Sequence, residues 1–257
     1  MIVSDEKRGQ IGYMMQPQNY SVNDGEGIRT VLFLAGCPLR CKWCANPESF
    51  TVSDKNHLVR AYSVEEVLKN IDKQKIFYRF SGGGITFSGG EPTLQLDFLD
   101  TLSEKLYDDG YDLAMETCGY FDYDRVKHVL RRMGLIFVDI KLMDGENHLT
   151  YTGKSNLIIH ENIRKMGEDL LPVVVRIPVI EGVNATEENI RETAKFVKRH
   201  LKSPKMELLP YHTLGDYKYD KLELEKTYLS YERPSDAKMD RLRNIVTEEG
   251  VQVVSYL

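Results

Sequence analysis

The 257-residue sequence has little cysteine, four residues in all, and a single tryptophan. It has no apolar run approaching the roughly 18 residues that span a bilayer, and its first residues mix charges where a signal peptide would be apolar. The net charge of −5 gives no reason to expect nucleic acid as a partner. We therefore expect a cytoplasmic protein with no membrane or nucleic-acid partner, in which thiols stay reduced.

What the chain does have is a cluster of three cysteines, Cys37, Cys41 and Cys44, directly after the apolar run 31–34. Thiolates this close together can hold zinc or an iron–sulfur cluster. Structural zinc sites usually draw two separated ligand pairs, and no second pair follows here. A [4Fe-4S] cluster normally takes four thiolates, so this loop would leave one iron open to a ligand. A disulfide is the weaker interpretation, because nothing else indicates an oxidising compartment.

Short apolar segments alternate with longer amphipathic ones along the chain, which predicts parallel βαβ units. Strands are predicted at 29–35, 84–87, 112–116, 135–140, 173–178 and 206–209. Helices are predicted at 64–73, 94–107, 123–132, 157–166, 187–200 and 236–249. Six such repeats predict an α/β fold, an open, partial (β/α)6 barrel of the TIM type.

The sequence contains no linker, internal repeat or low-complexity block, and we expect a single domain over 1–257. Its core is predicted at about 20–215, followed by a helix and strand within about 234–257. Ser63 with Glu66 has the pattern of a capping box, and Thr186 with Asn189 is a weaker helix start.

Candidate site residues fall where a parallel barrel places its active site, at the carboxyl ends of strands and in the loops that follow. Six residues lie at or just past the ends of six predicted strands: Cys37, Gly89, Glu116, Asp139, Arg176 and His212. We therefore expect six separate segments to converge on one mouth.

The spacing C-x3-C-x2-C, followed by Gly89-Gly90-Glu91-Pro92, resembles the radical S-adenosylmethionine (SAM) superfamily. Four runs in order then resemble the glycyl-radical enzyme activating enzymes, of which the pyruvate formate-lyase type is the best known. These runs are DGEGIRT at 24–30, SGGGITFSGGEP at 81–92, VDIK at 138–141 and LLPYH at 208–212. The similarity covers most of the chain and implies the same partial barrel.

The resemblance implies an activity. Cys37, Cys41 and Cys44 would hold three irons of a [4Fe-4S] cluster, while the fourth chelates the amino and carboxylate groups of SAM. One electron from flavodoxin or ferredoxin would cleave SAM to methionine and a 5′-deoxyadenosyl radical. That radical would take a hydrogen atom from a glycine in a loop of a partner glycyl-radical enzyme. We expect the activase itself to be a monomer.

The resemblance also assigns roles to individual residues. Asp24 would help to receive the partner's loop. Gly89, Gly90 and Glu91 would form the edge that binds the SAM amino group, and His212 would contact the nucleoside. The remaining implied contacts are the cover over the cluster and adenine, Trp43 and Ala45, and the lining of the SAM pocket, Asp139, Ile140 and Lys141.

Several of these residues have a structural alternative. Glu116, Thr117 and Asp139 are candidates for a monovalent cation site beside the SAM carboxylate, although the best-known relatives have aspartate where Glu116 stands. Carboxylates at neighbouring strand ends could instead form a buried ion pair with Lys141. Arg176 would pair with the SAM carboxylate or form a structural salt bridge. We expect Cys118 to be a packing residue rather than a fourth ligand.

The partner enzyme is not fixed by the sequence. The run CANPES at 44–49 resembles activases of the dehydratase and decarboxylase type, which often carry a cysteine-rich, ferredoxin-like insert; residues 45–80 contain no cysteine, so no insert is expected. Two other functions stay open. One is a radical SAM enzyme acting on a small molecule, such as a deazapurine synthase. The other is a zinc-binding interaction module, which would contain zinc without sulfide.

Overall fold

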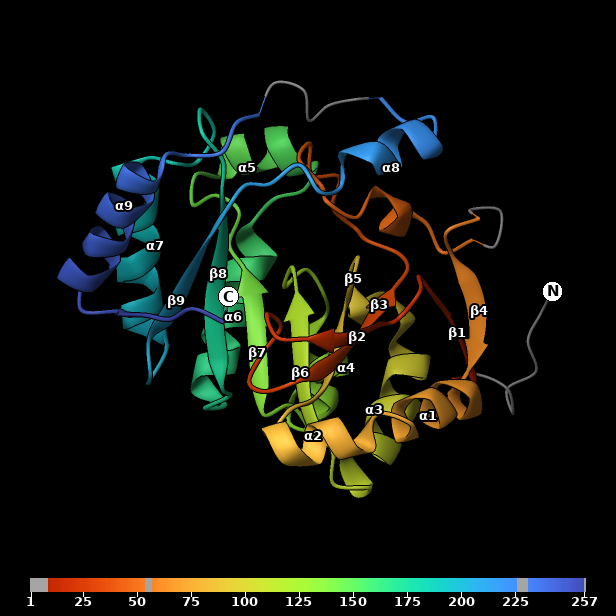
Figure 1. The fold of residues 1–257 in the computed structure, drawn as a ribbon. Helices are drawn as coiled ribbons and strands as arrows, with labels where there is room; N and C mark the ends of the chain where they lie inside the picture. Colours follow the sequence, from red (N-terminus) through yellow and green to blue (C-terminus); the bar gives the residue numbers. More distant parts are fainter. Residues whose placement is uncertain (1–8, 54–56, 226–230, 257) are drawn as a thin grey trace.

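The computed structural model describes residues 9–53, 57–225 and 231–256. These residues form one ten-stranded sheet with the strand order β10-β9-β8-β7-β6-β5-β3-β1-β4, and β2 pairs with β3 beside this path. In Figure 1 the main strands stand side by side, helices α3, α4 and α6 lie behind them, and β2 crosses in front.

The six predicted strands are all present and form the centre of the sheet. They are β3 (Arg29–Leu34), β5 (Gly84–Gly89), β6 (Asp112–Thr117), β7 (Leu135–Asp139), β8 (Val173–Val179) and β9 (Lys205–Pro210). Each pairs in parallel with the next in this order. Most of their residues are buried, as expected of parallel strands covered on both faces. The prediction of an unclosed, partial barrel is confirmed.

The six predicted helices are also present, within a few residues of their expected ends. They are α1 (Val64–Asp72), α3 (Leu96–Asp108), α4 (Tyr123–Leu130), α6 (Leu157–Glu168), α7 (Glu187–His200) and α9 (Asp236–Glu248). The side chain of Ser63 accepts a hydrogen bond from the Glu66 amide, and Thr186 caps α7 through the Asn189 amide. Both predicted helix starts are therefore confirmed.

The structure contains further elements that the sequence pattern did not predict. They are β1 (Ile11–Met14), β2 (Gln18–Ser21), β4 (Arg60–Ser63), α2 (Lys75–Ser81), α5 (Gly145–Thr152), α8 (Asp216–Lys221) and the 3-10 helices η2 (Pro47–Phe50) and η3 (Pro92–Gln95). The predicted helix 94–107 thus begins as η3 before α3 takes over. The expected final strand is β10 (Gln252–Val253), which pairs in parallel with β9.

The main core lies between the sheet and its covering helices, where Phe87, Leu102, Ile163 and Val197 are each 2% exposed or less. A smaller apolar cluster joins Trp43 to Leu142, Ile180 and Tyr211 at the carboxyl ends of the strands. These two clusters fix the strand ends and the loops after them. None of the described helices is long and apolar enough to cross a membrane.

Candidate metal and cofactor site

The cysteine loop begins directly after β3 and is held at both ends. The Gly36 amide donates to the Ser49 carbonyl at 2.7 Å, which closes the base of the loop. Inside the loop, the Arg40 guanidinium donates to the carbonyls of Cys37 at 2.6 Å and Phe50 at 3.0 Å. The segment with the cysteines therefore contains its own cation, which ties its backbone together.

The three thiols have the chemistry that an iron–sulfur cluster requires. Burial raises the pKa of Cys41 to about 12 and also raises that of Cys44. A buried thiolate is costly unless it is paired, and bonding to a metal removes that cost because the metal displaces the proton. Within the described residues, no three His, Cys, Asp or Glu side chains gather closely enough to hold a single ion. The soft donor set on one loop nevertheless fits a cluster.

Cys118 lies against this loop. A hydrogen bond between the Cys118 and Cys37 thiols lowers the pKa of Cys37 and raises that of Cys118. Cys118 is 6% exposed and follows β6 rather than β3. It therefore packs beside a predicted ligand, on a different segment of the chain.

Gly89 and Gly90 allow the glycine loop to lie against the end of β3. A Cβ atom on Gly89 would fall 2.2 Å from the Leu34 carbonyl oxygen, and one on Gly90 2.2 Å from that of Gly36. Gly89 also has a φ of +117°, which favours glycine. The Gly90 amide donates to Leu34 at 2.9 Å and the Glu91 amide to Gly36 at 2.7 Å. Glycine is therefore required at both positions because the two backbones approach each other too closely for a side chain.

Glu91 is fully buried and joins this loop to the end of β6. One carboxylate oxygen accepts hydrogen bonds from the Thr93 hydroxyl and amide. The other accepts from the Thr117 hydroxyl at 2.7 Å and the Cys118 amide at 2.8 Å. Because Thr117 is engaged with Glu91, its side chain is directed away from that of its strand neighbour Glu116. The structure does not bring these two candidates together as one cation site.

Arg176 lies in the middle of β8 rather than at the strand end as predicted, and it pairs in register with Asp139 at the end of β7. Its guanidinium donates to Glu207 at 2.6 Å and is also paired with Glu116. It lies 3.4 Å above the Phe137 ring. The structural salt bridge predicted as one alternative for Arg176 is therefore present. The side chain also faces the barrel interior, where the other alternative, contact with the SAM carboxylate, would take place.

Glu116 also faces this interior, where the Ser88 hydroxyl donates to its carboxylate at 2.6 Å. Burial raises the pKa of Glu116 to about 7, although Arg176 opposes the shift, and Asp24 adds to it. Asp24 is half-buried and paired with the Ser21 hydroxyl. The structure therefore brings Asp24 and Glu116 to one region of the barrel.

The run 139–141 forms a compact unit at the end of β7. Asp139 pairs with Lys141, and the buried Ile140 donates its amide to the Arg176 carbonyl at 3.0 Å. Burial by itself would lower the pKa of Lys141, but Asp139 and the neighbouring Cys41 raise it, so the ammonium stays charged. The structural alternative of an ion pair is present here, close to the cysteine loop.

The other predicted contacts surround the same loop. Trp43 is 6% exposed and packs against Tyr151 and Tyr231, at ring separations of 5.8 and 5.9 Å. Ala45 lies against Gly215, and the exposed His212 accepts only a local hydrogen bond from the Leu214 amide among the described residues. Trp43 is therefore packed against neighbouring aromatic side chains, whereas His212 is exposed.

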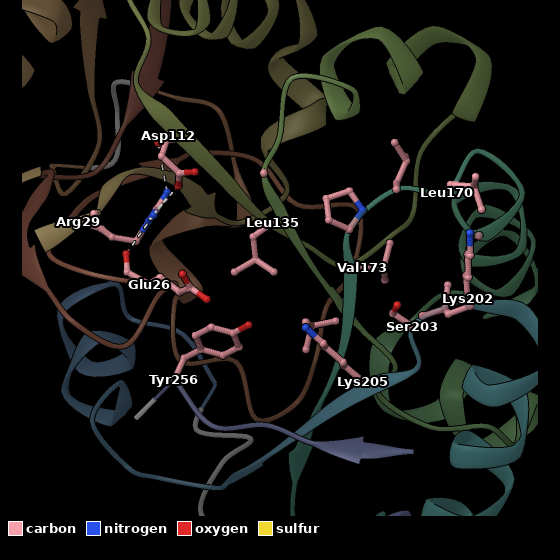
Figure 2. Close-up of a pocket in the computed structure, with 17 residues that line it drawn as sticks. Glu26, Arg29, Asp112, Leu135, Leu170, Val173, Lys202, Ser203, Lys205 and Tyr256 are labelled. Atoms are coloured by element: carbon pink, nitrogen blue, oxygen red, sulfur yellow. Dashed lines mark hydrogen bonds and ion pairs between the residues drawn. The ribbon is translucent and has the colours of Figure 1, made fainter. Parts of the chain in front are cut away.

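A cavity of about 440 Å³ lies at the other end of the strands (Figure 2). Its walls include Asp112, Leu135, Val173 and Lys205, which begin β6, β7, β8 and β9. None of the predicted site residues lines it. This cavity is therefore separate from the cysteine loop, at the end of a barrel where residues contribute to stability.

The comparisons with known proteins agree with this geometry. A family model described as the radical SAM superfamily matches residues 31–197. The pyruvate formate-lyase-activating enzyme of Clostridium pasteurianum is 33% identical over 238 residues, which covers 93% of this chain and 98% of that protein. The chain belongs to the activating-enzyme family of the radical SAM superfamily. Membership of this superfamily implies a [4Fe-4S] cluster and SAM as cofactors.

Other members of the activating-enzyme family are similarly close. The isethionate sulfite-lyase activating enzyme of Oleidesulfovibrio alaskensis is 36% identical over 279 residues, covering 86% of this chain and 90% of that protein. A solved domain of the pyruvate-formate lyase-activating enzyme from Bacteroides vulgatus has a TM-score of 0.54 and 34% identity. It covers 67% of this chain and 98% of that domain.

Sequence reasoning missed several residues that shape this radical SAM site. They are Arg40, Ser88, Glu207, Lys218 and Tyr219. Two of them had a visible signal: Arg40 lies between two cysteines, and Glu207 is a carboxylate in an otherwise apolar strand. Lys218 and Tyr219 had none, because they lie in a polar segment far along the chain.

Proposed function

We propose that this chain is a radical SAM activase that installs a glycyl radical on a partner enzyme. The observation that carries the proposal is the loop with three cysteines at the carboxyl end of β3, in a chain similar to named activating enzymes over most of its length. When bound, the cluster and SAM would supply a 5′-deoxyadenosyl radical that takes a hydrogen atom from a glycine of the partner.

In this proposal the chain's own residues position these cofactors. Cys37, Cys41 and Cys44 hold three irons, and the carbonyl edge of Gly89 and Gly90 receives the SAM amino group. The location of both glycines directly beside the end of β3 supports that pairing of roles. It would bring the amino-group site next to the cysteine loop that holds the cluster.

The remaining SAM contacts are proposed from the barrel interior and its rim. The pair of Asp139 and Lys141 lies beside the cysteine loop, where it would line the SAM pocket with Ile140, and His212 at the exposed rim would contact the nucleoside. Arg176 would meet the SAM carboxylate only by sharing its guanidinium with Glu116 and Glu207. Trp43, Ala45 and the buried Glu91 would hold the loops that surround SAM.

A monovalent cation beside the SAM carboxylate has less support. Glu116 is paired with Arg176 and Asp139 with Lys141. A cation there would have to draw these carboxylates from the pairs that they form, and Thr117 from Glu91. A monovalent cation at this place would make SAM binding depend on such a cation, which a binding measurement with and without it tests.

The partner is proposed to be a glycyl-radical enzyme, with flavodoxin or ferredoxin as electron donor. The activase itself is proposed to be a cytoplasmic monomer.

The alignment to the pyruvate formate-lyase-activating enzyme covers 93% of the chain in 238 positions. The alignment to the isethionate sulfite-lyase activating enzyme needs 279 positions to cover 86%, and so has gaps opposite this chain. This difference supports a single domain without a ferredoxin-like insert.

The test uses anaerobically reconstituted, reduced protein with SAM and purified glycyl-radical enzymes of the lyase, dehydratase and decarboxylase types. Electron paramagnetic resonance (EPR) should show a glycyl radical on one partner, which is lost when the partner's glycine is replaced by alanine. The Cys37→Ala variant is the matched inactive control. Formation of 5′-deoxyadenosine without a radical on any partner would favour a small-molecule substrate, and zinc without sulfide would contradict the cluster.

A further inference from the structure

Helix α8 lies beside the segment that follows the cysteines. Figure 1 shows it next to the orange chain around residue 50, and α8 contacts η2 there. The helix belongs to the segment after β9, which includes His212. A segment from the far end of the barrel thus reaches back to the cysteine loop.

Lys218 makes the densest contact between the two segments. Its ammonium donates to the Ala45 carbonyl at 3.0 Å, to Asn46 Oδ1 at 2.9 Å and to Glu48 Oε1 at 2.5 Å. An ammonium has three N–H donors, so each of them finds an acceptor on this short stretch. The side chains of Lys218 and Glu48 are only 17% and 7% exposed, and a pair this buried is fixed rather than loosely solvated.

Tyr219 adds a contact to a cysteine itself. Its hydroxyl donates to the Cys44 carbonyl at 2.9 Å, and the residue is 2% exposed. Gly215 allows this approach, because a Cβ atom there would fall 2.5 Å from the Ala45 carbonyl oxygen. As far as the structure describes the chain, Cys44 and Ala45 receive hydrogen bonds from other segments only through Tyr219 and Lys218.

The two sides of the cysteine loop are thus held differently. Cys37 is tied by Arg40, a residue of the loop itself, and the amides of Arg40 and Lys42 donate to Thr152 and Tyr151 at the end of α5. On the Cys44 side, the Cys44 amide donates to the Cys41 carbonyl at 3.1 Å within the loop, and the hydrogen bonds from a distant segment of the described chain come from Lys218 and Tyr219 of α8. We propose that Lys218 and Tyr219 are positioning residues that clamp Cys44 in place relative to the other two ligands.

This inference rests on the proposed function, because it concerns a cluster held by the loop. Groups that orient metal ligands from outside typically change affinity or activity by about 10-fold or more when removed. The clamp therefore predicts that a cluster leaves the protein faster when the contact from α8 is lost. It also predicts a broader EPR signal from the reduced cluster with SAM when this contact is lost, because Cys44 would then adopt more than one position.

The experiment compares reconstituted wild type with Lys218→Met, Tyr219→Phe, and Lys221→Met as the matched control on an exposed position of the same helix. The readout is the anaerobic rate of cluster loss to an iron chelator, followed by absorbance, with EPR of the reduced cluster before and after SAM. We expect loss about 10-fold faster in Lys218→Met, a smaller acceleration in Tyr219→Phe, and the wild-type rate in Lys221→Met. The SAM-dependent EPR signal should broaden in the first two.

A double variant distinguishes the effect of losing the Lys218 contacts from the effect of losing its positive charge. Lys218→Met leaves Glu48 as a buried carboxylate without this cation, whereas Lys218→Met/Glu48→Gln restores neutrality without restoring the contacts to Ala45 and Asn46. Fast loss in both supports the clamp; a return to the wild-type rate in the double variant overturns it. If Lys218→Met does not fold, Tyr219→Phe carries the test, because it removes a single hydroxyl.

Failure of this inference and failure of the proposed function give different results. Wild type that cleaves SAM and loses its cluster at the same rate as Lys218→Met and Tyr219→Phe overturns the clamp alone. Wild type that assembles no cluster overturns both. Circular dichroism melting of the same samples shows whether a faster loss reflects a general loss of folding.

Discussion

The guanidinium of Arg176 lies 2.6 Å from the carboxylate of Glu207, and both side chains are almost completely buried. The amide of Tyr256 donates to the other oxygen of the same carboxylate at 2.7 Å. Arg176 is thus fixed by the neighbouring strand before any ligand enters the barrel. The residue that would recognise the SAM carboxylate is at the same time part of the barrel's internal structure.

This arrangement predicts a large effect on stability when Arg176 is removed. Arg176→Met would leave Glu116 and Glu207 without their shared cation, and removing one partner of a buried pair costs about 3 to 5 kcal/mol. The matched control is Arg233→Met, which breaks an exposed pair with Asp236 and should cost less than about 1 kcal/mol. Urea unfolding of the apoproteins measures both. Equal costs for the two variants would show that Arg176 contributes no more than a surface cation.

Glu116 predicts a dependence of stability on pH. Its folded pKa of about 7 lies above the ordinary value of 4.5, so between these values the folded protein holds a proton that the unfolded chain has released. Its contribution is complete below about pH 4.5 and is lost as the pH rises through about 7. We expect wild type to lose about 1 to 3 kcal/mol over this window relative to Glu116→Gln. Parallel pH curves from urea unfolding would contradict this assignment.

His160 is also expected to make stability depend on pH, but here stability is lost as the pH falls. Burial lowers its pKa from 6.5 to about 4, its ring packs on Phe196 at 5.0 Å, and its Nε2 atom is buried without a partner among the described residues. The unfolded chain binds a proton at His160 below about pH 6.5, whereas the folded protein binds it only near pH 4, so stability falls as the pH falls between these values.

We expect His160→Phe to resist acid better than wild type by about 1 to 3 kcal/mol at pH 4, with the exposed His57→Phe as control. Thermal unfolding between pH 4 and 8 provides the measurement. An identical acid limb in wild type and His160→Phe would rule out His160 as the source.

Cys118 is expected to pack against the cysteine loop without being a cluster ligand. Cys118→Ala should keep the iron and sulfide content of wild type, because the three thiols of the loop are sufficient to hold the cluster. Cys41→Ala should lose most of it. Iron and sulfide analysis after identical anaerobic reconstitution distinguishes the two variants. A loss in Cys118→Ala equal to that in Cys41→Ala would make Cys118 a ligand.

The central fold could be predicted because its signals are local and repeated. Each of the six parallel strands is an apolar run, and each covering helix has an amphipathic period or a capping residue such as Ser63. The missed elements lack these signals. Helix α8, with the sequence DYKYDK, buries only Tyr219, and α5 buries only His148 and Thr152. Such short segments are helical because of what they contact, and contacts between distant segments cannot be read from a period.

The candidate site divides in the same way. The cysteines, the glycine loop and the run 139–141 form motifs, so their positions could be predicted. The partners of these residues could not: that Glu91 would be occupied by Thr117, or that Arg176 would be paired with Glu207, depends on which side chains meet across strands. Arg176 lies within β8 rather than at its end, but it stands level with Asp139, the last residue of the neighbouring strand β7.

The contact between Gly90 and Gly36 has a consequence for transplanting this site. The two loops touch backbone to backbone, and a Cβ atom on Gly90 would fall 2.2 Å from the Gly36 carbonyl oxygen, so the cysteine loop leaves no room for a side chain at Gly90. A cysteine loop grafted onto another α/β scaffold would therefore need the glycine loop of the adjacent strand as a matched second piece. The minimal portable unit is a two-strand module, β3 and β5 with both loops, rather than the cysteine motif alone.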